Sequence, residues 1–386
     1  MESSKSGYSE ITKLRIPNPE YNQLLPDTAH NIPFFTITDG DLIRYNMTEA
    51  FQSIFNKQPN LKTDKNDIID FLNSDGDTKP LEELKKRQLS YTQALTMEGL
   101  LTHKELTTAL FHHMKGSSSP GIDGFTVNHI RIFWNDLGHI TTDAINSSFG
   151  SELTTSLRKA VIKLLRKGNK DPTLTGNYRP ISLLSIFYKI ASCAITQRIK
   201  PAVNSIIGRQ QKAYIKSNNI GSVLLNLLNL IKHINDKKKN AIIILIYFRK
   251  AFDSIDHIFM KNTLSLLGFG PDIIEWIRLF FHNREASILL GGHMSKKITL
   301  DQGVPQGDVV SPYIFILMVE LLLLKINYTK NLTGITFATI ESRSETFADN
   351  TTIFLTRTAN NLKHCTKYIQ AFHQISGLAC NIDKTV

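Results

Sequence analysis

The pattern of hydrophobic and polar positions divides the chain into a polar first part and a more apolar remainder. In the first part, weakly apolar segments at 39–55, 67–73 and 81–89 alternate with polar stretches, and each segment predicts a short helix. No pattern of chemically reactive residues occurs there. We therefore interpret residues 1–100 as a helical connector, with a ragged first 30 residues.

Apolar periodicity predicts further helices downstream. Thr102 is followed three residues later by Glu105, which forms a capping box at the start of a helix that ends near His113. Apolar side chains recur at helical spacing in residues 181–199, which follow the NYRP segment, and in residues 221–234. Two more helices are predicted, at 271–281 and from Ser311-Pro312, where proline occupies the first turn.

One strand is predicted from a continuous apolar run. Residues 241–248 read AIIILIYF, which predicts a strand buried on both faces or nearly so. Asp253 and Ser254 follow at the position where they would cap the next helix.

Two hairpins complete the predicted elements. The segments 286–290 and 297–300 flank Gly291-Gly292, and a second hairpin at 344–355 has Asp349 and Asn350 at its turn. The second turn suits an ordinary surface hairpin, and it also suits a tip that presents a carboxylate to a divalent cation. The order of strand, helix, hairpin, loop, helix and hairpin predicts an α+β fold with an antiparallel sheet backed by helices.

Length, composition and charge refine this outline. The chain has 386 residues, 41% of them hydrophobic, which is ample for a globular core. Its net charge is +11, and residues 151–240 contain seventeen Lys or Arg against three acidic residues. Such a basic block attracts phosphate backbones and indicates nucleic acid as the partner. A solvated basic face and a surface for acidic proteins are the alternatives.

Cysteine use and hydropathy bear on the compartment. Three cysteines without a Cys-x-x-Cys pair predict neither a disulfide framework nor a thiolate zinc site, so we expect an intracellular protein of the cytoplasm and/or nucleus. The N-terminus lacks the apolar core of a signal peptide. The most apolar run, 312–326, is interrupted by Glu320 and Lys325 and is too short to cross a bilayer, so no membrane partner is expected.

Four short segments occur in a fixed order along the chain. They are NYRPISLL at 177–184, FRKAFDS at 248–254, GVPQGDVVSP at 303–312 and FADN at 347–350. In this order and at these intervals they resemble the reverse transcriptase domain of non-LTR (LINE-type) retrotransposons, from about residue 101 to the end of the chain.

The resemblance implies a right-hand polymerase architecture. It implies basic fingers at 101–240 and a palm with an antiparallel sheet at 241–386, and residues 375–384 look like the next palm segment. No sequence remains for a thumb, so a truncated fragment of a larger element is expected. The implied partners are an RNA template, an RNA–DNA hybrid and a dNTP, and the implied cofactor is Mg²⁺.

The metal site departs from the family pattern. Members of the family bind two Mg²⁺ ions with three aspartates, whose positions here are occupied by Tyr247, Asp349 and Asn350. Only Asp349 is retained. A neutral phenol and an amide are poor substitutes for carboxylates around Mg²⁺. The sequence therefore predicts an RNA-directed DNA polymerase, a nucleotidyltransferase, with weak or no activity.

Other family positions are kept. Phe252 matches the aromatic residue that packs under the incoming sugar, although plain core packing explains it equally well. Gln306 and Gly307 match the loop that touches the template and the nascent base pair. Lys167 and Arg179 match the basic residues of the fingers that hold the triphosphate.

Three further aspartates are candidates for substitute metal ligands. Asp253, Asp256 and Asp308 lie near the motifs, but the favoured roles are a helix cap, an exposed turn residue and a loop residue, respectively. The sequence thus leaves open an impaired polymerase, a non-catalytic RNA- or DNA-binding remnant, and a pseudogene product without a retained role.

Overall fold

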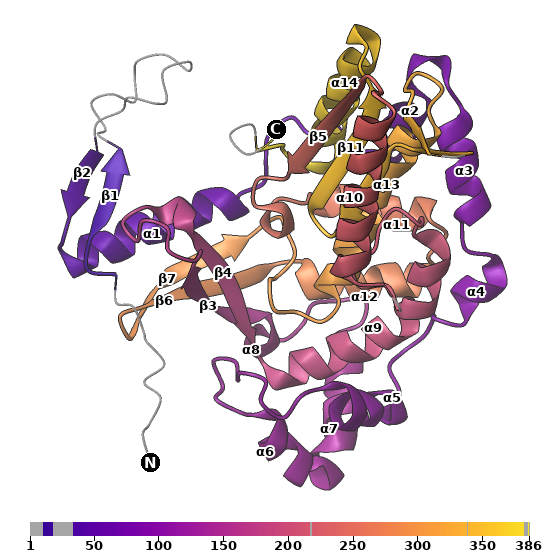
Figure 1. The fold of residues 1–386 in the computed structure, drawn as a ribbon. Helices are drawn as coiled ribbons and strands as arrows, with labels where there is room; N and C mark the ends of the chain where they lie inside the picture. The colour runs from indigo at the N-terminus through magenta and orange to yellow at the C-terminus, as the bar shows by residue number, and fades with distance from the viewer. Residues whose placement is uncertain (1–10, 18–33, 217, 338, 382–384, 386) are drawn as a thin grey trace.

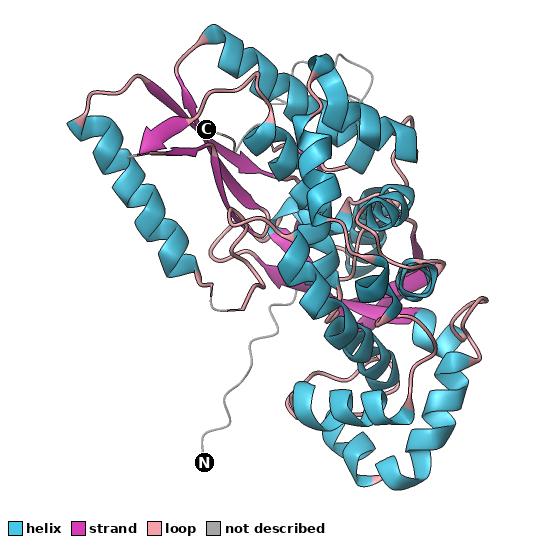
Figure 2. Cartoon of the chain, turned by 90° about the vertical axis from the view of Figure 1, so that its right-hand side faces the viewer, coloured by secondary structure: helices cyan, strands magenta, loops and turns pink. Residues whose placement is uncertain are grey.

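A computed structural model describes residues 11–17, 34–216, 218–337, 339–381 and 385 (Figures 1 and 2). Helices and several small sheets together confirm the predicted α+β class. Most of the ragged start expected at residues 1–30 lies outside the described residues.

The N-terminal part is integrated into the rest of the protein. Its elements are β1 (Leu14–Pro17), β2 (Phe34–Ile37), α1 (Gly40–Phe55), α2 (Lys65–Asn73), α3 (Lys79–Arg87) and α4 (Tyr91–Leu95). The three helices expected here are confirmed, and the carboxylate of Asp39 caps α1 by accepting hydrogen bonds from the backbone of Asp41 and Leu42. Because α1 packs on β7 and α3 packs on α13, this part belongs to the common core.

A four-stranded sheet joins two distant parts of the chain. Its strands are β3 (Lys159–Arg166), β4 (Tyr178–Leu184), β6 (Arg284–Leu290) and β7 (His293–Leu300), in the order β4-β3-β6-β7. The β3–β6 pair is parallel and the others are antiparallel. The predicted hairpin at Gly291-Gly292 is confirmed. The sheet spans the boundary expected at residue 240, and the domain limits themselves stay a prediction.

The helix predicted over 181–199 begins later than expected. Residues up to Leu184 form strand β4, and helix α9 extends over Ile186–Ile206. Burial in β4 alternates from one residue to the next, with Pro180 on the buried face, so the period is that of a strand. Pro180 is tolerated because β4 lies at the edge of its sheet.

A three-stranded antiparallel sheet carries the hairpin with the acidic turn. Its order is β10-β11-β5, with β10 (Ser344–Phe347), β11 (Asn350–Thr356) and β5 (Ala241–Tyr247). The predicted strand and hairpin are therefore confirmed. The expectation that the strand is buried on both faces is wrong, because β5 is an edge strand in which only Ile246 is buried. Helix α10 (Ile220–Asp236) covers one face of this sheet, where Leu230 packs on Phe354.

Helices surround both sheets. They are α5 (His103–Thr108), which continues as a π-helical turn (Ala109–His113), α6 (Val127–Ile132), α7 (Trp134–Asn146), α8 (Thr155–Arg158), α11 (His257–Leu266), α12 (Pro271–Phe281), α13 (Ser311–Tyr328) and α14 (Ala359–Ser376). Two short strands, β8 (Ile335–Phe337) and β9 (Ile340–Ser342), form a separate hairpin. The capping box between Thr102 and Glu105 is confirmed at the start of α5.

Helix α13 is the central helix of the core. Among the described residues it is the one helix long and apolar enough to cross a membrane, but 78% of it is buried inside the protein. It packs against α3, α9, α11 and α14. Its apolar composition is therefore explained by its place in the core.

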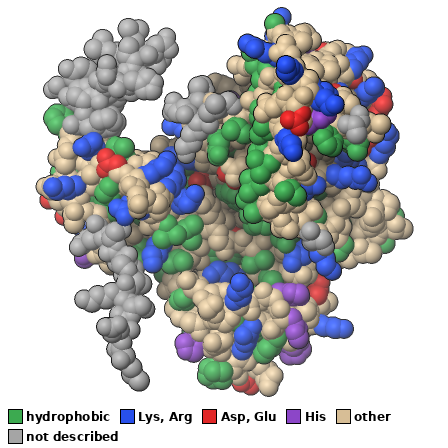
Figure 3. All heavy atoms as spheres, in the orientation of Figure 1, with side chains coloured by type: hydrophobic (Ala, Val, Ile, Leu, Met, Phe, Trp, Pro, Cys, Tyr) green, Lys and Arg blue, Asp and Glu red, His purple; other side chains and the backbone are tan. Residues whose placement is uncertain are grey.

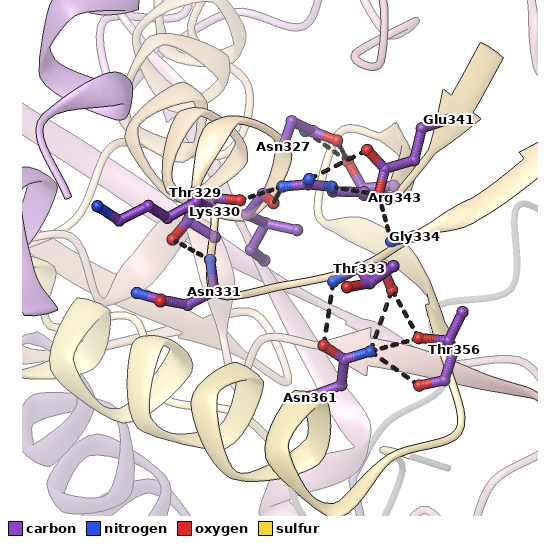
Figure 4. A network of polar contacts seen from close by, with 12 residues as sticks. Asn327, Thr329, Lys330, Asn331, Thr333, Gly334, Glu341, Arg343, Thr356 and Asn361 are labelled. Atoms are coloured by element: carbon purple, nitrogen blue, oxygen red, sulfur yellow. Dashed lines mark hydrogen bonds and ion pairs between the residues drawn. The ribbon is translucent and has the colours of Figure 1, made fainter. Parts of the chain in front are cut away.

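A polar network holds the acidic hairpin against α13 and α14 (Figure 4). The guanidinium of Arg343 donates to the carbonyls of Ile326 and Thr329 at the end of α13. The buried amide of Asn361 donates to the carbonyls of Thr333 (3.1 Å) and Thr356 (2.9 Å) and accepts from the amide of Thr333 (3.0 Å).

Replacing Asn361 by alanine is expected to lower the free energy of unfolding by about 2 kcal/mol, because the Thr333 amide loses its acceptor and the carbonyls of Thr333 and Thr356 each lose one of their donors. Urea denaturation measures this change. The control is Asn360→Ala, one residue earlier on the exposed side of the helix, which should stay within about 0.5 kcal/mol of the natural chain. Equal effects of the two substitutions would contradict the role given to the network.

Candidate functional site

A cleft of about 690 Å³ lies between the β3–β4 turn and the tip of the three-stranded sheet. Figure 3 shows the surface hollowed between the lobe of α1 and β4 and the lobe of α10, with Lys and Arg side chains gathered on the α1 and β4 side. Seven of the eight residues assigned from the sequence line the cleft: Lys167, Arg179, Tyr247, Phe252, Gln306, Asp349 and Asn350. Gly307 lies beside it, in a pocket of about 210 Å³ that Phe252 and Gln306 share.

The tip of the three-stranded sheet brings three of these residues together. Asn350 and Tyr247 are direct cross-strand partners on β11 and β5, and Asp349 precedes Asn350 in the turn. Tyr247 is 40% exposed. Burial raises the pKa of the Asp349 carboxyl, and the positive charge of Arg179 acts against this shift.

A buried glutamine fixes the backbone of the turn. The Gln211 side chain accepts from the amide of Ala348 (3.0 Å) and donates to its carbonyl (3.3 Å). Ala348 has a φ of 57°, in the left-handed region that non-glycine residues seldom adopt. Gln211 therefore holds Asp349 in place, and no pattern in the sequence pointed to it.

The donor atoms at this tip are a poor match for a pair of magnesium ions. They comprise one carboxylate, one phenol and one amide, whereas Mg²⁺ favours carboxylate oxygens. Within the described residues, no three His, Cys, Asp or Glu side chains are grouped so that they could hold a metal ion. The side chains of this tip therefore do not supply the set of carboxylates that a pair of magnesium ions requires.

Asp253 is a buried carboxylate that lines the cleft. It is 3% exposed, and the Gln306 amide donates to both of its carboxylate oxygens at 3.0 Å. Burial raises the pKa of Asp253 to about 7, while this hydrogen bond and the charges of Lys250 and Lys167 lower it. The prediction that Asp253 and Ser254 cap the next helix is wrong, because the chain makes a tight turn over Ala251–Asp253 and α11 starts later.

Of the other two aspartates, Asp256 differs from its expected role and Asp308 lies in a loop, as expected. Asp256, expected as an exposed turn residue, is buried and caps α11 by accepting from the amides of Ile258 (2.8 Å) and Phe259 (2.9 Å). Asp308, expected as a loop residue, is buried with its oxygens engaged by Ser192 and Tyr188. Each carboxylate thus has a structural partner.

The loop that carries Gln306 is docked at three points. The amides of Gly303 and Val304 donate to the carbonyls of Ile255 and Phe252 at 2.7 Å. The amide of Ser182 on β4 donates to the Gln306 carbonyl, also at 2.7 Å. The loop consequently ties the end of the β5 segment to the edge strand of the other sheet.

Gly303 permits this docking. Its φ is +80°, and a Cβ there would lie 2.6 Å from backbone atoms of Asp253. Gly292 has the same φ of +80° but open space around it, which makes it a matched control. We expect Gly303→Ala to cost about 2 kcal/mol more free energy of unfolding than Gly292→Ala, as measured by urea denaturation. Equal costs would show that the backbone angle, and not the close approach, governs both sites.

Phe252 both packs in the core and faces the cleft. Its ring stacks on Phe315 of α13 with centroids 4.5 Å apart and planes 15° apart, and it is half-buried at the cleft wall. Both interpretations of this residue from the sequence are therefore compatible with its place.

The cleft is rich in cations. Lys167 donates to the carbonyl of Gly176 at 2.8 Å within the β3–β4 turn, and Arg179 is exposed on β4. Lys170, Arg249 and Lys250 also line the cleft, and the sequence analysis did not single them out. Arg249 and Lys250 lie inside the FRKAFDS segment, which was the available signal for them.

Comparisons with known proteins place these residues in context. Residues 165–386, more than half of the chain, match the family model described as "Reverse transcriptase (RNA-dependent DNA polymerase)". The chain is 27% identical over 303 residues to the "Transposon TX1 uncharacterized 149 kDa protein" of Xenopus laevis, covering 78% of this chain and 22% of that protein.

Two further relatives come from other mobile elements. The identity is 27% over 225 residues to the "Retrovirus-related Pol polyprotein from type-1 retrotransposable element R2" of Popillia japonica, covering 56% of this chain and 30% of the relative. The identity to the "RNA-directed DNA polymerase from mobile element jockey" of Drosophila funebris is 28% over 159 residues, covering 40% of this chain and 17% of the relative. The chain thus spans less than a third of the length of each relative.

Proposed function

Because the chain belongs to the reverse transcriptase (RNA-dependent DNA polymerase) family, we propose that its cleft binds RNA template, RNA–DNA hybrid and dNTP but transfers nucleotides poorly. The observation that carries the proposal is the direct pairing of Tyr247 with Asn350 beside Asp349. The resemblance to non-LTR retrotransposon proteins implies carboxylates at all three positions. We further propose that the protein acts in the cytoplasm and/or the nucleus, where an RNA template is found.

The impairment follows from charge. In this family two Mg²⁺ ions activate the primer hydroxyl and stabilise the charge that develops on the attacking and leaving oxygens. A phenol and an amide, unlike a carboxylate, offer no negative charge at pH 7. Two fewer negative charges beside Asp349 weaken the attraction for dications, so the chemical step slows even when substrates are bound.

The direct test is extension of a DNA primer on an RNA template with Mg²⁺. We expect extension at least about a hundredfold slower than by the corresponding domain of the R2 relative from Popillia japonica, under conditions where hybrid binding is saturated. Extension within tenfold of that domain would overturn the proposed impairment.

Binding without catalysis is the second candidate function, and the charge of the cleft favours it. Five cations line the cleft, namely Lys167, Lys170, Arg179, Arg249 and Lys250, against the carboxylates of Asp253 and Asp349. A protein that contacts several phosphates releases their counterions, so its affinity falls steeply with salt.

We expect the logarithm of RNA affinity to fall against the logarithm of salt concentration with a slope of about −3 or steeper, as phosphate contacts by several cleft cations require. Fluorescence anisotropy of a labelled RNA measures this slope. A flat response would show that the basic residues do not contact phosphates.

A further inference from the structure

Lys250 is a cation of the cleft without a partner for its charge. The residue is half-buried and lines the cleft, and its ammonium makes no hydrogen bond or ion pair within the described residues. The nearby Asp253 carboxylate is already occupied by the Gln306 amide. Partial burial of an ammonium that has no hydrogen-bonding partner in the protein costs free energy, and this ammonium is left open to water or to a ligand in the cleft.

The backbone at Lys250 is held in a conformation that few lysines adopt. Its φ is 50°, in the left-handed region, which costs about 1 kcal/mol or more for a side chain of this kind. Contacts on both sides fix it: the Arg249 amide donates to the Ala379 carbonyl at 2.7 Å, and the Lys250 carbonyl accepts from the Asp253 amide at 2.8 Å and from the Ser254 hydroxyl at 3.0 Å. Strain fixed in this way is typical of a functional position.

Other cations surround this ammonium. The pKa of Lys250 is lowered to about 8, chiefly by burial and also by the positive charges of Arg249 and Lys167, while Asp253 acts in the opposite direction. Arg249 is its neighbour in the chain, and Lys167 belongs to the β3–β4 turn that forms another part of the cleft wall. An anion between these groups would relieve their repulsion and supply the missing partner.

We propose that Lys250 binds a phosphate group in the cleft, in the space shared with Lys167. The inference rests on the proposed function, and it adds a phosphate ligand to the pair expected from the resemblance, Lys167 and Arg179. The phosphate belongs either to the triphosphate of the incoming nucleotide or to the backbone of the bound strand. Both sources present the same oxygen-rich anion, to which an ammonium donates up to three hydrogen bonds.

The test compares Lys250→Gln with Lys232→Gln, an exposed lysine of α10 that does not line the cleft. Inorganic tripolyphosphate probes the triphosphate source by titration calorimetry, and a labelled RNA–DNA hybrid probes the strand source by anisotropy. We expect Lys250→Gln to weaken the binding of one of the two probes at least about tenfold. Lys232→Gln should weaken the binding of tripolyphosphate less than twofold. If the binding of the hybrid is weakened, the slope of the logarithm of its affinity against the logarithm of salt concentration should also become shallower by about 0.9, the value for one phosphate contact.

A pH series separates phosphate binding from a structural role. Because its pKa is lowered, Lys250 loses its charge as the pH rises through about 8, so the affinity of the natural chain for the affected probe should fall between pH 7 and 9. Lys250→Arg, which stays charged, should bind the probe and flatten this fall.

Three outcomes decide between the claims. The role of Lys250 would be overturned if the folded Lys250→Gln variant bound both probes with the affinity of the natural chain. It would also be overturned if the variant lost affinity only in proportion to a loss of stability measured in urea. Either result would leave the proposed function standing. Failure of the natural chain to bind either probe would overturn both. The rate of nucleotide transfer does not enter, so an inactive but phosphate-binding chain still supports the inference.

Discussion

Replacing Tyr247 and Asn350 together by aspartate is expected to raise RNA-templated primer extension at least about a hundredfold over the natural chain. This gain corresponds to about 2.7 kcal/mol of transition-state stabilisation. The two positions are direct cross-strand partners and both are exposed, so the new carboxylates need no rearrangement to join Asp349 at the same tip.

The same variant makes a prediction that does not depend on catalysis. Three neighbouring carboxylates repel one another until a cation binds between them. We therefore expect the melting temperature of the double variant to rise on addition of Mg²⁺, by mass action on the folded state, and that of the natural chain to stay nearly constant.

The controls identify which residues are responsible. Either single substitution should restore much less activity than the pair, and Asp349→Asn in the double variant should abolish the gain. If the double variant binds the hybrid and gains Mg²⁺-dependent stability but does not extend a primer, the two replaced positions are not what limits catalysis.

Local sequence rules predicted the elements whose signals are self-contained. Helix α1 begins where Asp39 can cap it, α5 begins at the Thr102–Glu105 capping box, and the β6–β7 hairpin turns at Gly291-Gly292. Each of these depends on contacts between residues close together in the chain, so a short window of sequence contains the full cause.

The misassigned elements depend on partners that are distant in sequence. The apolar residues of β4 fit a helical pattern, but in the structure β3 and the Gln306 loop provide hydrogen-bonding partners on the two sides of the strand at Ser182. The apolar run of β5 suited a buried strand, but only β11 pairs with it along its length. Periodicity cannot distinguish these cases, because a short apolar run fits either environment.

The candidate site shows the same division. The family motifs indicated which residues belong together, and seven of them line one cleft, although their roles stay predictions. Gln211 was missed because its contact is with a turn more than a hundred residues away. Lys250 was missed although it lies in the FRKAFDS segment, because its significance depends on burial and on an unusual backbone angle, which that motif does not express.

Asp308→Ala is expected to lower the free energy of unfolding by about 3–5 kcal/mol. Asp308 is 4% exposed, accepts from the Tyr188 hydroxyl at 3.0 Å and from the Val309 amide at 2.7 Å, and also bonds the Ser192 hydroxyl. The buried guanidinium of Arg284, 2% exposed, lies 4.6 Å from the centre of the Tyr188 ring.

The size of this effect comes from the charge left behind. Burial raises the pKa of the Asp308 carboxyl, and the positive charge of Arg284 acts against this shift, so the two charges compensate each other. Within the described residues, two of the Arg284 nitrogens have no hydrogen-bond partner, so removing the carboxylate leaves this cation nearly unsupported in the core. An isolated buried charge is among the most destabilising changes a protein can carry.

Two matched variants locate the cause of the loss. Asp308→Asn keeps the volume and one acceptor oxygen but not the charge, so it should cost less than alanine but still more than about 1 kcal/mol. Asp301→Ala, in the same loop but exposed, should change stability by no more than about 0.5 kcal/mol. Because Asp308 follows Gln306 and Gly307 directly, its loss should also weaken hybrid binding under conditions where the variant is still folded. If urea denaturation gives similar free energies of unfolding for Asp308→Ala and Asp301→Ala, other groups compensate the charge of Arg284. The stability of the loop then does not depend on the pairing of Asp308 with Arg284.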